Sequence, residues 1–118
     1  MADLTGKWKY EETYEGGHAY GELFIVQNGD GLTGKIIFSD IPDTAPPFVI
    51  RENLEGRLQE RKVRLKGIDM DIIDSETLFD YELDSWFGIL VDENTISGLS
   101  EDEQGVEGYF TFKRMKNE

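Results

Sequence analysis

The chain has 118 residues and a mass of 13.5 kDa, which is typical of one domain with its own hydrophobic core. It carries 25 acidic and 12 basic residues, a formal net charge of -13, so its average surface repels phosphate groups. Nucleic acid and anionic membranes are therefore not expected as partners. Because the chain has no cysteine, disulfides, thiolate nucleophiles and cysteine-ligated zinc are excluded.

The N-terminal residues Met1 to Leu4 lack the basic and apolar regions of a signal peptide. No stretch is long and apolar enough for a membrane-spanning helix, and no linker divides the chain. We therefore expect a single domain over residues 1–118. Cytoplasmic location is the default expectation, and a secreted mature form stays open.

The segment from Thr5 to Tyr14 alternates in polarity and predicts a first strand. A glycine-rich turn at 15–18 leads to a second strand over 19–27. The run Asn28-Gly29-Asp30-Gly31 predicts a tight hairpin into a third strand over 32–39, because Asn-Gly and Asp-Gly tolerate positive φ. The segment 40–47 holds all 3 prolines and predicts an irregular loop.

A fourth strand is predicted over 48–58, where apolar residues alternate with polar ones. The alternative is a helix, because Leu54, Leu58 and Leu65 also lie near helical spacing after a possible cap at Asn53. Gly56 would destabilise such a helix, and residues 62–66 alternate cleanly, which favours a strand followed by another strand.

The apolar positions change from odd to even numbers after Gly67, and again near Asp84. The residues concerned are Val63, Leu65, Ile68, Met70, Ile72, Thr77, Phe79, Tyr81, Leu83, Trp86, Gly88 and Leu90. Each change needs one extra residue, supplied either by a β-bulge or by a turn between two strands. Bulges at both places predict eight strands, and turns at both predict about ten.

Short strands near 95–99 and 106–113, separated by an acidic turn, complete the pattern. Glycines alternate with bulky residues at the inward positions, which suits the taper of a small barrel. We predict an all-β fold: an antiparallel up-and-down meander closed into a small barrel of eight strands, or up to ten.

Three stretches resemble the calycin superfamily, and in particular small bacterial lipocalin-like domains. They are Gly6-Lys7-Trp8, the hairpin Asn28-Gly29-Asp30-Gly31, and the closing segment from Gly105 to Arg114. The resemblance implies a lipocalin-like barrel in which Trp8, preceded by Gly6, is a structural plug at one end. It also implies that Lys113 or Arg114 packs as a cation over the indole ring. No residues resemble the biotin site of avidins, so the resemblance implies the shape without a ligand.

A binding site is expected at the mouth opposite Trp8, for a small hydrophobic or aromatic molecule and without a cofactor or metal. The expected ligand-binding residues are Tyr10, Tyr14, His18, Tyr20, Phe38, Ile50, Phe79, Tyr81 and Phe110. The alternative is a filled barrel that acts as a structural or interaction module, with a homodimer formed through an outer apolar face. Candidates for that face are Phe24, Val26, Ile37, Phe87, Ile89 and Tyr109.

Two charged groups have structural explanations that we prefer to functional ones. Asp69, Asp71 and Asp74 would form an inward carboxylate cluster only without a bulge at Gly67, and the bulge is the cheaper arrangement. On the outer face, a charge ladder is preferred to an anion site; its members are Lys62, Arg64, Lys66, Asp80, Glu82 and Asp84. No nucleophile or nucleotide motif is present, so catalysis has no positive support.

Overall fold

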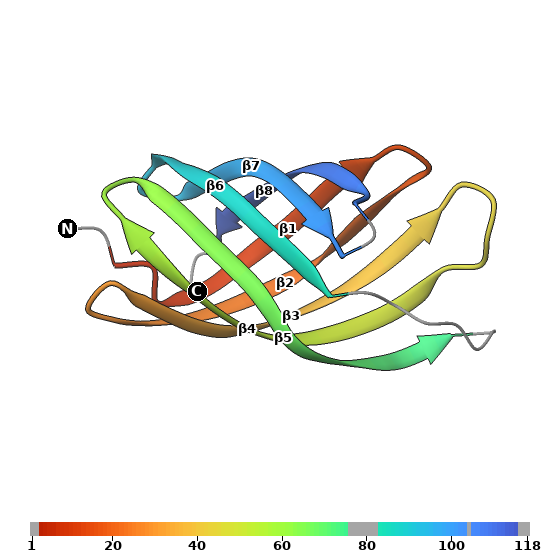
Figure 1. Ribbon diagram of the computed structural model, residues 1–118, viewed down its shortest axis with the longest axis horizontal. Helices are drawn as coiled ribbons and strands as arrows, with labels where there is room; N and C mark the ends of the chain where they lie inside the picture. Colours follow the sequence, from red (N-terminus) through yellow and green to blue (C-terminus); the bar gives the residue numbers. More distant parts are fainter. Residues whose placement is uncertain (1–2, 76–82, 104, 116–118) are drawn as a thin grey trace.

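The computed structural model describes residues 3–75, 83–103 and 105–115. In these residues eight antiparallel strands form one closed barrel, in which each strand pairs with its neighbours in the chain and β8 returns to β1 (Figure 1). The strands are β1 (Gly6–Tyr14), β2 (Gly17–Asn28), β3 (Gly31–Pro42), β4 (Phe48–Gln59), β5 (Lys62–Ser75), β6 (Asp84–Asp92), β7 (Thr95–Asp102) and β8 (Glu107–Arg114). The predicted meander is confirmed, in its eight-strand form. Within the same residues there is no helix that could serve as an apolar membrane span.

The two ends of the barrel differ. The floor end carries the tight hairpins after β2, β4 and β6 together with both chain termini, and the mouth end carries the β1–β2 hairpin and the β3–β4 loop (Figure 1). At the floor, Gly29 has a φ of 63°, as the Asn-Gly hairpin requires. At the mouth, β3 continues through Pro42, which pairs with Gly17, so the predicted irregular loop begins later than expected.

The β4–β5 hairpin replaces the helix that we considered for residues 53–65. Arg57 pairs with Arg64 and Gly56 with Leu65, so both segments are extended. A β-carbon built on Gly56 would lie 1.7 Å from the carbonyl oxygen of Arg64. Because only a hydrogen fits there, this glycine lets the two strands approach closely.

The first change from odd to even apolar positions, after Gly67, is a β-bulge, which is the arrangement that we preferred to a turn. The β4–β5 register shifts between Asn53 and Leu54, which leaves Ile68 as the extra residue, 46% exposed. We expect the bulge to turn Ile68, Met70 and Ile72 inward, and for Ile68 this is wrong. Met70 does pack against the core, whereas Ile72, the partner of Ile50, is 37% exposed. At the second change β5 ends before β6 begins at Asp84, and Thr77 lies in the segment outside the described residues.

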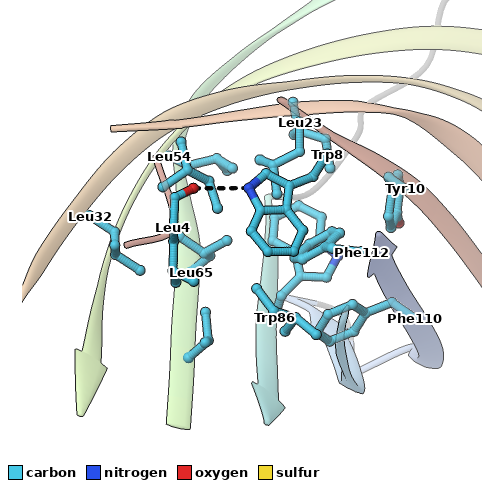
Figure 2. Close-up of a cluster of buried hydrophobic side chains, with 14 of the residues drawn as sticks. Leu4, Trp8, Tyr10, Leu23, Leu32, Leu54, Leu65, Trp86, Phe110 and Phe112 are labelled. Atoms are coloured by element: carbon cyan, nitrogen blue, oxygen red, sulfur yellow. Dashed lines mark hydrogen bonds between the residues drawn. The ribbon is translucent and has the colours of Figure 1, made fainter. Parts of the chain in front are cut away.

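The floor of the barrel is closed by Trp8, whose side chain is fully buried. Its indole nitrogen donates a hydrogen bond to the carbonyl oxygen of Leu4 at 2.9 Å, within a cluster of apolar side chains (Figure 2). The guanidinium of Arg114 lies 4.4 Å from the Trp8 ring centroid, and its Nη2 donates to the carbonyl oxygens of Asp3 and Glu93. Arg114, and not Lys113, is therefore the cation over the indole.

Candidate functional site

Four residues expected to line a ligand site form part of the packed core. Tyr10, Phe38, Ile50 and Phe110 all point inward and are at most 2% exposed. The ring of Tyr10 lies 5.5 Å from that of Phe38, in an edge-to-face arrangement. These side chains fill the middle of the barrel, where Figure 2 shows Tyr10 and Phe110 beside the floor cluster.

The remaining expected ligand-binding residues are divided between the two faces of the wall. Tyr14 points inward at the mouth end, whereas His18 and Tyr20 occupy outward positions of β2, and Tyr20 is 51% exposed. His18 and Tyr20 border an outer hollow of about 880 Å³ over β1, β2, β7 and β8, not the lumen. Phe79 and Tyr81 lie outside the described residues.

A different group of polar side chains occupies the lumen above the core. Glu12 on β1, Asp40 on β3, Glu52 on β4 and Asp84 on β6 all hold inward positions in the mouth half of the barrel. We call these residues the carboxylate tier. Asp40 is 7% exposed and Glu52 is fully buried, so the barrel places acidic groups where a hydrocarbon core would ordinarily continue.

Glu12 is held by neutral donors from the core beneath it. Its Oε1 accepts hydrogen bonds from the Tyr10 hydroxyl at 2.6 Å and from the indole nitrogen of Trp86 at 3.3 Å. A β-carbon at Gly108 would lie 2.8 Å from Glu12 Oε2, so this glycine makes room for the carboxylate. Glu12 thus has a fixed position with satisfied hydrogen bonds.

Asp40 has a comparable arrangement nearer the rim. Its Oδ1 accepts a hydrogen bond from the Tyr14 hydroxyl. Burial of the Tyr14 ring, and after it this hydrogen bond, raise the pKa of Tyr14. The pKa of Asp40 is itself raised, because burial disfavours its charged form. Tyr14 therefore belongs to the site as the partner of a carboxylate.

Glu52 is the exception in the tier. Its Oε1 accepts a hydrogen bond from the backbone amide of Asp84 at 3.2 Å. Its Oε2 is buried and has no hydrogen-bond partner among the described residues. The Asp84 side chain also hydrogen-bonds the Glu52 carboxyl. A hydrogen bond between two carboxyl groups requires a proton on one of them.

Burial sets the protonation behaviour of this part of the lumen. The pKa of Glu52 is raised by burial and, to a smaller extent, by the nearby negative charge of Glu12. Burial also raises the pKa of Glu12, although hydrogen bonds from Tyr10, Ser100 and Trp86 act in the opposite direction. Glu12, Asp40 and Glu52 therefore hold protons more tightly than exposed carboxylates do.

No cation of the described chain balances this charge from within. The inward positions of the mouth half, as far as the structure describes them, contain no lysine, arginine or histidine. The described ion pairs, such as Lys7 with Glu22 at 3.2 Å, lie on the outer wall. Among the described residues, no group of carboxylates or histidines is arranged to hold a metal ion.

The described members of the aspartate group and of the charge ladder, except Asp84, lie on the outer face of the barrel. Asp71 pairs with Arg51 at 2.5 Å and Asp69 accepts a hydrogen bond from Asn53 at 2.6 Å, so the inward cluster of Asp69 and Asp71 is ruled out by the bulge. The side chain of Asp74 is outside the description. In the ladder, Arg64 lies opposite Phe87 and its guanidinium is 5.3 Å from that ring.

Asp84 points inward, so its place in the proposed outer ladder is wrong. Asp80 and Glu82 are outside the described residues. Lys62 and Lys66 do face outward, opposite Ile89 and Ser85 respectively. The sequence does contain a signal for the carboxylate tier, which we missed. Glu12 and Glu52 each lie two residues from an apolar inward residue of the same strand, Tyr10 and Leu54, so the alternation of the strand places them inward as well.

Comparison with solved structures shows the same fold in designed proteins. A redesigned β-barrel matches with a TM-score of 0.67 at 11% identity, over 96% of this chain and 92% of that chain. The redesigned barrel mFAP1, bound to DFHBI, matches with a TM-score of 0.66 at 11% identity, over 94% of each chain. A fluorescence-activating β-barrel designed de novo matches with a TM-score of 0.58 at 17% identity, over 98% of this chain and 100% of that chain.

No known protein-family profile and no curated protein sequence matches the chain. At these identities the structural matches show the fold: an eight-stranded antiparallel β-barrel, similar to designed barrels over nearly its whole length.

Proposed function

We propose that this protein is a lipocalin-like barrel that binds a small molecule in the mouth half of its lumen. The observation that carries the proposal is the buried Oε2 of Glu52, for which the described part of the chain supplies no hydrogen-bond partner. Leaving such an atom unpaired costs about 1 to 3 kcal/mol, and more when the group is charged. A ligand that supplies the missing partner explains why the chain places a carboxyl group there.

Two further observations support a binding role. The designed barrel mFAP1, which has a similar fold, is bound to the small molecule DFHBI, and this supports a small-molecule site in a barrel of this architecture. The closed floor of this protein, with Trp8 beneath Arg114, also leaves the mouth as the end from which a ligand enters. The same pairing of Gly6-x-Trp8 with a terminal cation is the basis for proposing lipocalin-like ancestry.

Native mass spectrometry of freshly purified protein tests the proposal. We expect a retained small molecule in the wild type, its loss in Glu52→Gln, and its retention in Tyr20→Ala, a control in the outer hollow. Retention in the lumenal variant together with loss in Tyr20→Ala would show that the molecule binds on the outer wall. A wild-type protein with no retained molecule, which also binds none of a panel of neutral, cationic and anionic aromatic compounds, would contradict the binding function.

A second candidate function is homodimerisation through the outer wall. Phe87, Leu99 and Tyr109 are paired in a row across β6, β7 and β8, and are 44%, 47% and 74% exposed. An unbroken exposed row of this kind is typical of a protein contact surface. It contains two residues of the predicted face, Phe87 and Tyr109, and adds Leu99. We call it the apolar row.

A further inference from the structure

We propose that the ligand of the carboxylate tier is a small organic amine, whose ammonium group binds at Glu52 and Asp84 and whose apolar body lies against Phe48 and Met70. The inference rests on the proposed binding function and specifies the chemical class of its ligand.

The groups around the carboxylate tier indicate that the ligand is positively charged. Glu12 and Asp40 receive hydrogen bonds from the neutral donors Tyr10, Trp86 and Tyr14. None of these donors carries a positive charge. The described part of the chain supplies no lumenal cation, so a cationic ligand is the group that satisfies both the charge and the open Oε2 of Glu52.

The number of carboxylate oxygens in the site indicates which type of cationic group it binds. An ammonium group has three N–H donors and no acceptor, which suits a site built from several carboxylate oxygens. Glu52 offers one free oxygen, and the Asp84 side chain lies within hydrogen-bonding distance of the same carboxyl group. A carboxylate or phosphate ligand would instead meet repulsion from the whole tier.

The apolar residues beside the carboxylate tier indicate that the rest of the ligand, next to its ammonium group, is apolar. Met70 is the β5 partner of Glu52, and Phe48 is the β4 partner of Asp40. Both side chains are only partly buried and pack on the edge of the core. An aliphatic or aromatic group next to the ammonium would cover them and remove apolar surface from water.

Binding of the amine also releases a proton to the solvent. In the empty site, burial raises the pKa of Glu52, so its carboxyl group holds a proton more tightly than an exposed carboxyl group does. The groups that face it are Glu12 on β1 and, farther away, Asp40 on β3, together with the neutral phenol of Tyr10. When the ammonium enters, this proton leaves to the solvent and the Glu52 carboxylate is charged. Affinity should therefore rise with pH.

Isothermal titration calorimetry with 2-phenylethylamine tests the inference, with 2-phenylethanol as the neutral analogue of the same shape. We expect the amine to bind the wild type at least about 10-fold more tightly than the alcohol. Glu52→Gln should weaken amine binding about 10- to 100-fold and leave the alcohol unaffected. Glu55→Gln, the same change at an outward position of β4, should bind like the wild type. Titrations in buffers with different heats of ionisation should show proton release.

Two results would overturn the amine assignment while leaving the binding function intact: equal affinity for the amine and the alcohol, or unchanged amine affinity in Glu52→Gln. Binding of neither compound, in a protein that also retains no molecule on purification, would contradict the binding function as well.

Discussion

At the scale of single residues, Glu52 couples binding to stability. Its folded-state pKa is raised above the ordinary value of 4.5, because burial disfavours the charged form. Below that ordinary value the proton is bound in both folded and unfolded states, and Glu52 has no pH-dependent effect. As pH rises above it, the unfolded state loses its proton more readily, so the free energy of unfolding decreases.

We therefore expect Glu52→Gln to stabilise the protein at pH 8 by about 1 to 3 kcal/mol and to have a smaller effect at pH 5. The measurement is chemical denaturation of both proteins at the two pH values. Comparing variant with wild type at each pH cancels the contribution of the surface carboxylates. A variant that is less stable than the wild type at pH 8 would show that Glu52 supports the fold, and would contradict this account.

At the scale of elements, the end of β8 closes the floor against β1. Arg114 covers the Trp8 ring and binds the carbonyl oxygens of Asp3 and Glu93, so it connects β8 with the N-terminal segment and the β6–β7 hairpin. Arg114→Met should lower the free energy of unfolding by about 1 to 2 kcal/mol. Lys113→Met, the outward neighbour on the same strand, should change it by less than about 0.5 kcal/mol in thermal and urea denaturation. Equal losses would show that Arg114 has no special role.

The strands were predictable because their inward residues repeat with period two, and this pattern also located the bulge after Gly67. The exact extra residue, Ile68, was not predictable, since parity alone does not say which residue leaves the ladder. The carboxylate tier was missed for a related reason. Glu52 occupies an inward position between Ile50 and Leu54. Because inward residues were identified by their apolar character, an acidic residue at such a position was not recognised as one of them.

At the scale of the whole molecule, the apolar row and the net charge of -13 act in opposite directions. Burial of Phe87, Leu99 and Tyr109 favours association, whereas repulsion between two acidic copies opposes it. If the row joins two copies, sedimentation velocity should show a dimer fraction that grows with ionic strength, because salt screens the repulsion. Leu99→Glu should restore the monomer, and Ile37→Glu, an exposed change on β3, should not. A wild-type protein that stays monomeric at high salt and millimolar concentration would exclude the dimer.

The two tryptophans of the chain are both buried in the core, but their indole nitrogens donate to different acceptors, and this gives the protein a built-in optical reporter. Trp8 donates its indole proton to the Leu4 carbonyl in the floor, far along the barrel from the mouth, whereas Trp86 donates to the Glu12 carboxylate. A change in charge or occupancy at the tier should therefore shift the emission of Trp86 and leave that of Trp8 unchanged. In a Trp8→Phe protein the remaining fluorescence would follow the lumen alone, without any attached dye.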